Sequence, residues 1–289
     1  MPTARVFARP PTSRRIVIDQ AMMLRALAGA IVAGLVTGRG RLTGSLGPSG
    51  QAAAFATGVL AAAAGWGFAA TLIVFFLAAD RLTRWQAEEK LRRTIAIVPQ
   101  SAERNATQVL ANGGFFIAFS VYALHHGNPR WTFAALGALA AASADTWATE
   151  IGTMWGGEPR SVLNGRTLAR GMSGGITMAG TLASVGGALL VATVGVLSIG
   201  WRDWRAIAVV AAAGVAGALF DSYVGAALQT KRWCDRCREW TERRVHPCGY
   251  RTKHRRGIAW LTNDLVNFAC TGAGAVAAVV IARFVMPRP

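Results

Sequence analysis

Residues 131–151 read WTFAALGALAAASADTWATEI, a run that is apolar over most of its length. A helix needs about 20 predominantly apolar residues to cross the hydrocarbon core of a bilayer, so this run predicts a membrane span. Two acidic residues, Asp145 and Glu150, interrupt the run near its end. A carboxylate inside a membrane span costs free energy, and its presence is by default a sign of function.

Further stretches of similar character occur along the 289-residue chain, at 16–36, 52–79, 105–124, 174–199, 205–228 and 261–286. The sequence therefore predicts an all-α, polytopic transmembrane bundle of about seven spans. We expect one transmembrane domain over 16–289, preceded by a flexible basic tail over 1–15. The stretch 52–79 is long enough for one tilted span or for a hairpin of two short helices that turns around 65–67.

The composition supports a membrane protein and argues against two other classes. Hydrophobic residues make up 53% of the chain and charged residues only 16%, yet the formal net charge is +17. A disordered chain requires low hydrophobicity. A soluble nucleic-acid-binding protein would carry its basic residues on a water-facing surface. We therefore expect a membrane as partner and no nucleic acid.

The basic residues are unevenly divided between the predicted loops. With seven spans, most of them fall in 1–25, 80–104, 151–173 and 230–260. The intervening segments hold only Arg39, Arg41, Arg130, Arg202, Arg205, Arg283 and Arg288. Because cytoplasmic loops are enriched in Lys and Arg, this pattern predicts a cytoplasmic N-terminus in a plasma or inner membrane. Two helices within 52–79 would scramble the alternation, so we expect a single span there.

Four carboxylates on three predicted spans lie in the same half of the bundle: Asp145, Glu150, Asp221 and Asp264. Amide side chains accompany them on helical faces of the same depth, at Gln108, Asn112, Asn263 and Asn267. Hydrogen bonding between helices would explain any single amide. Several convergent carboxylates favour a hard divalent cation such as Mg²⁺, which prefers oxygen ligands. We expect the four carboxylates to hold magnesium near the cytoplasmic face.

The segment 152–175 is rich in glycine, carries three arginines and ends in a Gly/Ser turn that opens the next span. Such a turn exposes backbone N–H groups and a positive helix-dipole end, which together suit a phosphate group. Arginine can bind phosphate oxygens through two parallel hydrogen bonds. An ordinary glycine-rich connection explains the pattern equally well. The candidate phosphate ligands are Arg160, Arg166, Arg170, Ser173, Gly174 and Gly175.

Three of the four cysteines lie in one loop together with a histidine, at Cys234, Cys237, His246 and Cys248. Three thiolates and one imidazole form a common tetrahedral donor set for structural zinc. A cytoplasmic loop is reducing, which argues against a disulfide. The spacing is shorter than in paired zinc knuckles, so a loop of free thiols stays open, and His254 is an alternative ligand. We expect a zinc-stapled cytoplasmic loop over 230–260.

Several motifs, taken in order, resemble one family of integral membrane proteins. They are RNATQVLANG at 104–113, ADTWATEIG at 144–152, PR at 159–160, GMSGG at 171–175, FDS at 220–222 with Gly225 and Gln229, and NDLVN at 263–267. The family includes plant phytyl-phosphate kinase and is distantly similar to CTP-dependent polyprenol kinases. The resemblance extends from about 40 to 285. It departs from the family at Arg166, where the family pattern has Lys, and the two side chains differ in geometry.

The resemblance implies an integral membrane kinase that transfers a phosphoryl group from CTP or ATP to an isoprenyl monophosphate and forms the diphosphate. It implies that the carboxylates hold Mg²⁺ while the arginines, the glycine turn and the amides bind phosphate groups. Positioning and charge neutralisation dominate such reactions. A membrane transporter or lipid carrier that uses the same carboxylates is the alternative. A structural or assembly protein is a third interpretation.

Overall fold

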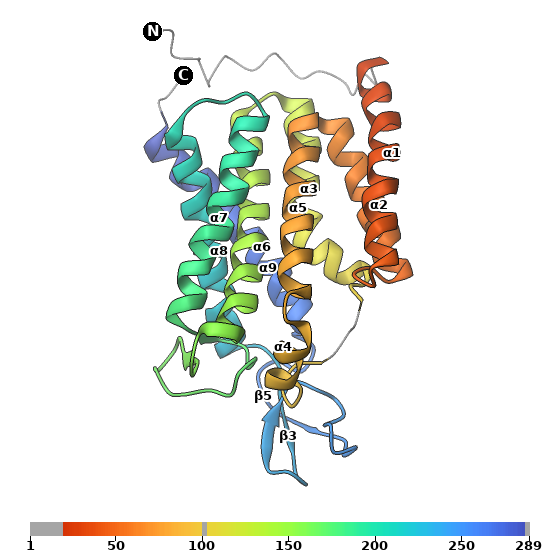
Figure 1. The fold of residues 1–289 in the computed structure, drawn as a ribbon. Coiled ribbons are helices and arrows are strands. Elements are labelled where there is room, and N and C mark those ends of the chain that lie inside the picture. Colours follow the sequence, from red (N-terminus) through yellow and green to blue (C-terminus); the bar gives the residue numbers. More distant parts are fainter. Residues whose placement is uncertain (1–19, 100–102, 287–289) are drawn as a thin grey trace.

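The computed structural model describes residues 20–99 and 103–286 as a helical bundle with a small β-sheet at one end (Figure 1). The long helices are α1 (Gln20–Leu42), α2 (Pro48–Ala64), α3 (Trp66–Arg84), α5 (Ala106–His126), α6 (Pro129–Trp155), α7 (Met178–Ser198), α8 (Trp204–Ala227) and α9 (Asn263–Val285). A short helix, α4 (Ala87–Thr94), follows α3. Six of the described helices are long and apolar enough to cross a membrane, namely α1, α3, α5, α7, α8 and α9. The predicted all-α membrane fold is confirmed.

The strands form two small antiparallel sheets in the connections between helices. One pairs β1 (Arg160–Ser161) with β2 (Gly175–Ile176), between α6 and α7. The other has the order β4-β3-β5, with β3 (Lys231–Cys234), β4 (Glu239–Thr241) and β5 (Lys253–Arg256), between α8 and α9. Figure 1 places this three-stranded sheet beyond one end of the bundle, which we call the sheet end.

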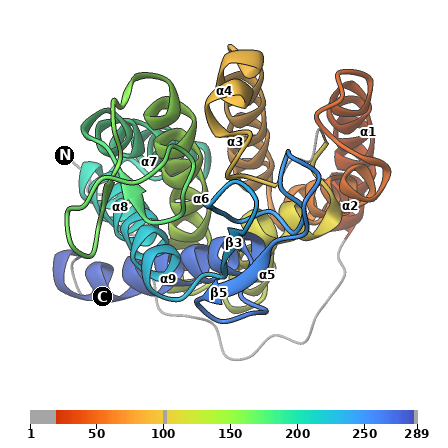
Figure 2. The same cartoon turned by 90° about the horizontal axis from the view of Figure 1, so that it is seen from below.

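The central helix is α6, which contains the stretch 131–151 and has α7, α8 and α9 on one side and α1 and α2 on the other (Figure 2). Residues 133–144 of α6 are all buried, and most of them are Ala or Gly. Because lipid offers no hydrophobic drive for helix association, membrane helices gain stability from close packing of small residues. A Cβ on Gly137 would lie 2.5 Å from the Gly274 carbonyl oxygen of α9, and one on Gly217 of α8 would lie 2.5 Å from the Ala141 Cβ. These contacts bring three backbones together about one to two turns away from Asp145 and Asp221.

The predicted single span at 52–79 is wrong, because the structure divides it into two helices. α2 ends at Ala64 and α3 begins at Trp66. Gly65 between them has φ 157° and ψ 147°, a backbone conformation that is nearly confined to glycine. The chain therefore reverses its direction at this residue. The distribution of Lys and Arg favours a single span, whereas the glycines at 65–67 indicate a turn. The structure has the turn.

The extra reversal changes the topology. α1 begins, and α9 ends, at the end of the bundle opposite the sheet (Figure 1). The seven-span prediction put the chain start and the Cys/His loop on one side, whereas the structure puts the start of α1 and this loop at opposite ends. The predicted tail at 1–15 lies outside the described residues. Among the described Lys and Arg residues, only five lie toward the end opposite the sheet: Arg25, Arg130, Arg202, Arg205 and Arg283. The positive-inside rule therefore still predicts a cytoplasmic sheet end.

Cysteine labelling in sealed vesicles tests this topology. With a membrane-impermeant maleimide, we expect Gln20→Cys and Arg202→Cys to react from the same side. Both positions are exposed, Gln20 begins α1, Arg202 precedes α8, and both helices begin opposite the sheet (Figure 1). Asn164→Cys, exposed between α6 and α7, will react only from the other side. Peptide mass mapping separates these sites from the native cysteines. If Gln20→Cys instead reacts together with Asn164→Cys, the seven-span arrangement is restored.

Candidate functional site

A cavity of about 1610 Å³ extends from the sheet end into the bundle. Its lining changes in character along its length. Toward the sheet end the walls carry charged and amide side chains from α5, α6, α8, α9 and the loops. Between α1, α2 and α3 the walls are mostly apolar, with Val32, Ala33, Val36, Ala62, Leu72, Ile73 and Phe76. The cavity is therefore suited to an amphipathic ligand.

Two carboxylates, Asp145 on α6 and Asp221 on α8, line the polar half and repel each other electrostatically. Of the charged residues that line the cavity, they lie furthest from the sheet-side ends of their helices. The Asn267 amide, with its nitrogen toward Asp221, donates to Oδ2 over 3.2 Å. Among the described residues, Asp145 has no hydrogen bond or ion pair. Neighbouring carboxylates with so few donors need a cation, a proton or water beside them, and Mg²⁺ is the cation that the sequence predicts.

The other predicted oxygen ligands also line the cavity. Asp264 and Asn263 lie in the first turn of α9, and Gln108 and Asn112 lie on α5. Gln108 has a structural task as well, because it forms a capping box with Asn105. Each of these two residues accepts a backbone N–H of the other over 3.0 Å, which begins α5 at Ala106.

Glu150 lines the cavity, but a cation already balances its charge. Lys90 Nζ of α4 lies 2.6 Å from Glu150 Oε2, and the Thr83 hydroxyl donates to Oε1 over 2.7 Å. Arg104 donates to the Thr83 hydroxyl over 3.0 Å and lines the same cavity. Burial lowers the pKa of Arg104, although nearby Glu150 and Asp80 oppose this shift. Glu150 therefore joins α4 to α6, and Arg104 is a half-buried cation at the start of the 104–113 motif, for which the sequence predicts no role.

The four predicted magnesium ligands do not form a closed cage. Within residues 20–99 and 103–286, one group of three or more His, Cys, Asp or Glu residues has its ligand atoms within 4.8 Å of one another. That group is the Cys/His set, and it contains none of the four carboxylates. Mg²⁺ usually binds proteins through one or two carboxylates and fills its shell with water and substrate phosphates. The pair Asp145 and Asp221 meets this requirement. A site that uses all four carboxylates stays a prediction.

The connection between α6 and α7 separates the predicted phosphate ligands into two groups. Arg160 and Arg166 are exposed and do not line the cavity, and Arg160 donates to the Gly165 carbonyl over 3.2 Å. The structure does not bring these two arginines to the other candidates. The second group lines the cavity and consists of Arg170, Ser173, Gly174 and Gly175.

The glycine turn at 173–175 already has partners for two of its N–H groups. Ser173 donates to Glu242 Oε1 over 2.9 Å, and Gly175 donates to the Met172 carbonyl over 3.1 Å. Gly174 has φ +84°, and a Cβ there would lie 2.2 Å from the Ala226 Cβ of α8. Close packing on α8 therefore explains this glycine, and the turn does not present an open row of donors to a phosphate.

Glu242, the residue after β4, occupies the mouth of the cavity and was not singled out from the sequence. Its Oε2 accepts the Gln229 side-chain amide over 2.9 Å, while Oε1 accepts Ser173. Burial raises the pKa of Glu242, and these hydrogen bonds together with Lys231 oppose the shift. In the sequence, Glu242 differs from its neighbours only as an acidic residue between the Cys/His ligands of a basic loop.

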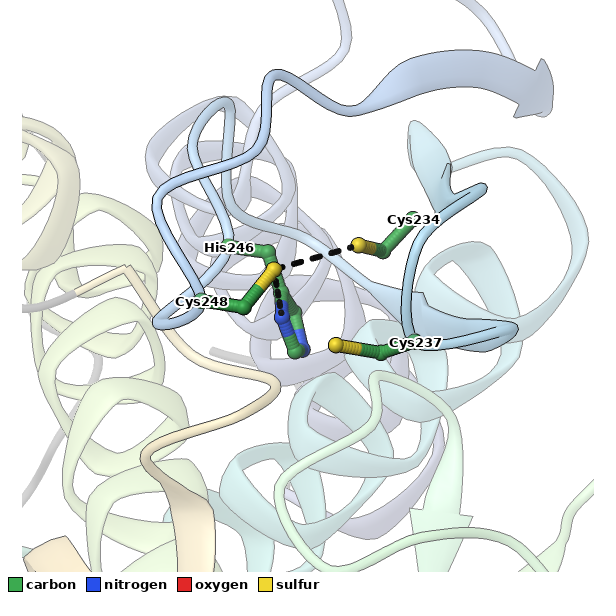
Figure 3. Close-up of side chains that lie close together, drawn as sticks. All are labelled: Cys234, Cys237, His246 and Cys248. Carbon is green, nitrogen blue, oxygen red and sulfur yellow. Dashed lines mark hydrogen bonds between the residues drawn. The ribbon is translucent and has the colours of Figure 1, made fainter.

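The predicted zinc ligands Cys234, Cys237, His246 and Cys248 converge (Figure 3). Cys234 Sγ lies 3.7 Å from Cys248 Sγ, and His246 Nδ1 lies 3.3 Å from the same sulfur. Zn–S bonds of about 2.3 Å in a tetrahedron place sulfurs about 3.8 Å apart, whereas a disulfide needs about 2.05 Å. The alternative ligand His254 lies outside the set, with Nε2 3.1 Å from the Gly257 carbonyl oxygen.

The thiols of the cluster differ in acidity, because a hydrogen bond with Cys248 raises the pKa of Cys237 to about 11. A backbone hydrogen bond from Tyr250 and the contact with His246 lower the pKa of the Cys248 thiol to about 6. The thiolate is the form of cysteine that binds metals. His246 Nε2 is buried without a hydrogen-bond partner, and the nearest carboxylate oxygen, on Glu239, is 3.6 Å away. The four side chains can therefore hold one metal ion.

Comparison with known proteins gives one family match and several relatives. Residues 31–275 match the family described as integral membrane protein DUF92. The chain is 27% identical to Protein PGR of Arabidopsis thaliana over 275 residues, which cover 87% of this chain and 94% of that protein. It is 32% identical over 168 residues to an uncharacterized membrane protein of Methanocaldococcus jannaschii, with 58% and 67% covered. An uncharacterized membrane protein of Synechocystis sp. is 27% identical, with 81% of each chain covered. No solved structure matches the chain.

The ion pair between Lys90 and Glu150 yields a stability prediction. Lys90→Met will lower the free energy of unfolding by roughly 3 kcal/mol, because Glu150 then keeps a buried charge without its cation. Adding Glu150→Gln will recover part of this loss, since it removes the unpaired charge. Lys253→Met, which breaks an exposed 2.7 Å pair with Asp235, is the control and will change stability by less than about 1 kcal/mol. Thermal unfolding in detergent measures all four proteins, and equal losses for Lys90→Met and Lys253→Met would contradict a structural role for the buried pair.

Proposed function

This chain belongs to the DUF92 family of integral membrane proteins, and on that premise we propose that it is a membrane kinase for an isoprenyl monophosphate. The donor is a nucleoside triphosphate, CTP or ATP, and the product is the lipid diphosphate. The names of the matched relatives state no activity. The proposal rests on the motif resemblance and on one observation, namely that a charged half and an apolar half belong to the same cavity.

The apolar half supports a lipid acceptor. Its walls come from α1, α2 and α3, and α1 itself is largely exposed along the bundle, with Leu27 and Leu35 among its exposed residues. An isoprenyl chain that enters beside α1 exchanges lipid surroundings for apolar walls. Its phosphate then lies toward the sheet end, where Arg104 and Arg170 line the cavity.

The polar half supports phosphoryl transfer. Asp145 and Asp221 would hold Mg²⁺, which when bound neutralises phosphate charge. Arg104, Arg170 and Arg244 also line the cavity and add positive charge. An oxygen of the lipid monophosphate forms a bond to the terminal phosphorus of the nucleotide, and the bond from that phosphorus to the bridging oxygen breaks. The nucleoside diphosphate leaves with the electron pair. The acceptor is already an anion, so the chain needs no strong general base.

A lipid carrier or transporter is the alternative. Alternating access would require polar groups that serve both ends of the bundle. The charged residues that line the cavity lie instead in the half nearest the sheet. This one-sided arrangement supports an enzyme that works at one membrane surface.

A transfer assay tests the proposal. Purified protein with Mg²⁺, γ-labelled CTP or ATP, and phytyl or geranylgeranyl monophosphate will form labelled lipid diphosphate. Asp145→Asn and Asp221→Asn will each lower the rate by roughly 100-fold or more, because they remove charge that positions the reacting phosphates. Asp203→Asn is the matched control, since Asp203 caps α8 at the opposite end and Asn caps a helix equally well.

Two outcomes would contradict the kinase proposal. Full activity of Asp145→Asn would remove this residue from the site. No transfer from either nucleotide, together with protein-dependent movement of the lipid between liposome leaflets, would identify a carrier.

A further inference from the structure

Glu242 lies on a segment that the Cys/His cluster holds at both of its ends. Cys237 precedes β4, and His246 follows Glu242 before the chain returns to Cys248. β4 pairs with β3, where Glu239 lies opposite Cys234. The cluster therefore closes a small loop, and Glu242 is the acidic residue of this loop that lines the cavity, where Arg243, Arg244 and Val245 follow it.

The residues beside Glu242 rest on the segment that follows α4. The Thr241 hydroxyl donates to the Ala96 carbonyl over 2.7 Å, and the Glu242 N–H donates to the Ile97 carbonyl over 3.0 Å. The Glu242 carboxylate itself joins Ser173 before α7 to Gln229 after α8. The Glu242 side chain thus joins the α6–α7 connection to the α8–α9 connection, and its backbone N–H adds the segment after α4.

The three-stranded sheet has little apolar interior to maintain this arrangement. All four residues of β5 are exposed, and the strands of the sheet are three or four residues long. Sheets of this size need further stabilisation, and the binding free energy of a structural metal ion acts directly as folding free energy. The cluster offers that stabilisation through three unoxidised cysteines and the partnerless, buried Nε2 of His246.

We propose that Cys234, Cys237, His246 and Cys248 bind a structural zinc ion, and that this ion holds Glu242 against the Ser173 amide at the mouth of the cavity. Glu242 is then a positioning residue. With zinc bound, its carboxylate orders the turn before α7 and adds negative charge beside Asp221. Without zinc, the turn and the carboxylate both lose their fixed places. The zinc site thereby acts on the cavity through Glu242, although none of its four ligands lines the cavity.

Metal analysis of the purified protein tests the first half of the proposal. Mass spectrometry of the metals will find about one zinc per chain. Cys237→Ser, chosen because the Cys237 side chain is exposed, will lose the zinc while the helical circular dichroism persists. Cys270→Ser is the matched control, because Cys270 is buried in α9 away from the cluster, and this variant will keep the zinc. Zinc-free wild-type protein that does not take up added zinc overturns the assignment.

Hydrogen–deuterium exchange of the wild-type protein tests the second half. Removal of zinc with a chelator will speed exchange of the Ser173 amide about tenfold or more, as expected when a hydrogen bond to a carboxylate is lost. Exchange in the centre of α6 will not change, and added zinc will restore the protection. Glu242→Ala will keep its zinc and exchange at Ser173 as fast as the chelated protein, and chelation will then add nothing at this amide.

Protection of Ser173 that survives zinc removal would overturn the link between zinc and Glu242. So would protection that survives Glu242→Ala. Neither metal content nor exchange depends on phosphoryl transfer, so failure of the kinase proposal and failure of this inference are distinguishable.

Discussion

Charge compensation inside the bundle is the constraint on which the rest of the structure depends, because a carboxylate away from water needs a cation, a proton or hydrogen-bond donors. Glu150 has Lys90, and Asp80 has Arg84. Glu242 has two donors, the Ser173 N–H and the Gln229 amide. Asp145 and Asp221 differ from all of these, since the Asn267 amide is the one hydrogen-bond donor that the described residues bring to the pair. A cation, a proton or water would each compensate these two carboxylates, and the proposed magnesium site uses the first of these.

The close packing of small residues makes this arrangement possible. Gly137, Gly217 and Gly274 let the backbones of α6, α8 and α9 approach so closely that a Cβ at any of them would collide with a neighbour. Bulkier residues there would move α8 and α9 away from α6, and Asp221 and Asn267 would move with them. The apolar half of the cavity lies on the other side of α6, toward α1, α2 and α3. The bundle thus has a tightly packed side, which positions Asp221 and Asn267, and a more open side, which can accept an apolar ligand chain.

Hydropathy found the membrane helices, and the rarity of charge in apolar helices pointed to Asp145 and Asp221. Both signals depend only on residues that are close in the sequence, so they can be recognised without the tertiary structure. The distribution of Lys and Arg does not predict the hairpin at Gly65, because a reversal at one residue leaves no loop whose charge could be counted. Glu242 and Lys90 were missed because an ionisable residue in a polar segment is ordinary, and only the tertiary structure shows which ones turn inward. Arg160 and Arg166 lie in the same kind of segment, and the sequence contains no sign that they remain outside the cavity.

We propose that one cavity holds both a lipid chain and its phosphate. Photo-crosslinking tests it most directly, with an isoprenyl monophosphate that carries a photoactivatable group at the far end of its chain. We expect that peptides containing Val36 or Ile73 are labelled in protein reconstituted into bilayers, and that unmodified phytyl monophosphate suppresses the labelling. Labelling confined to outward-facing residues such as Phe284, or labelling unaffected by the competitor, would show that the cavity does not hold the lipid chain.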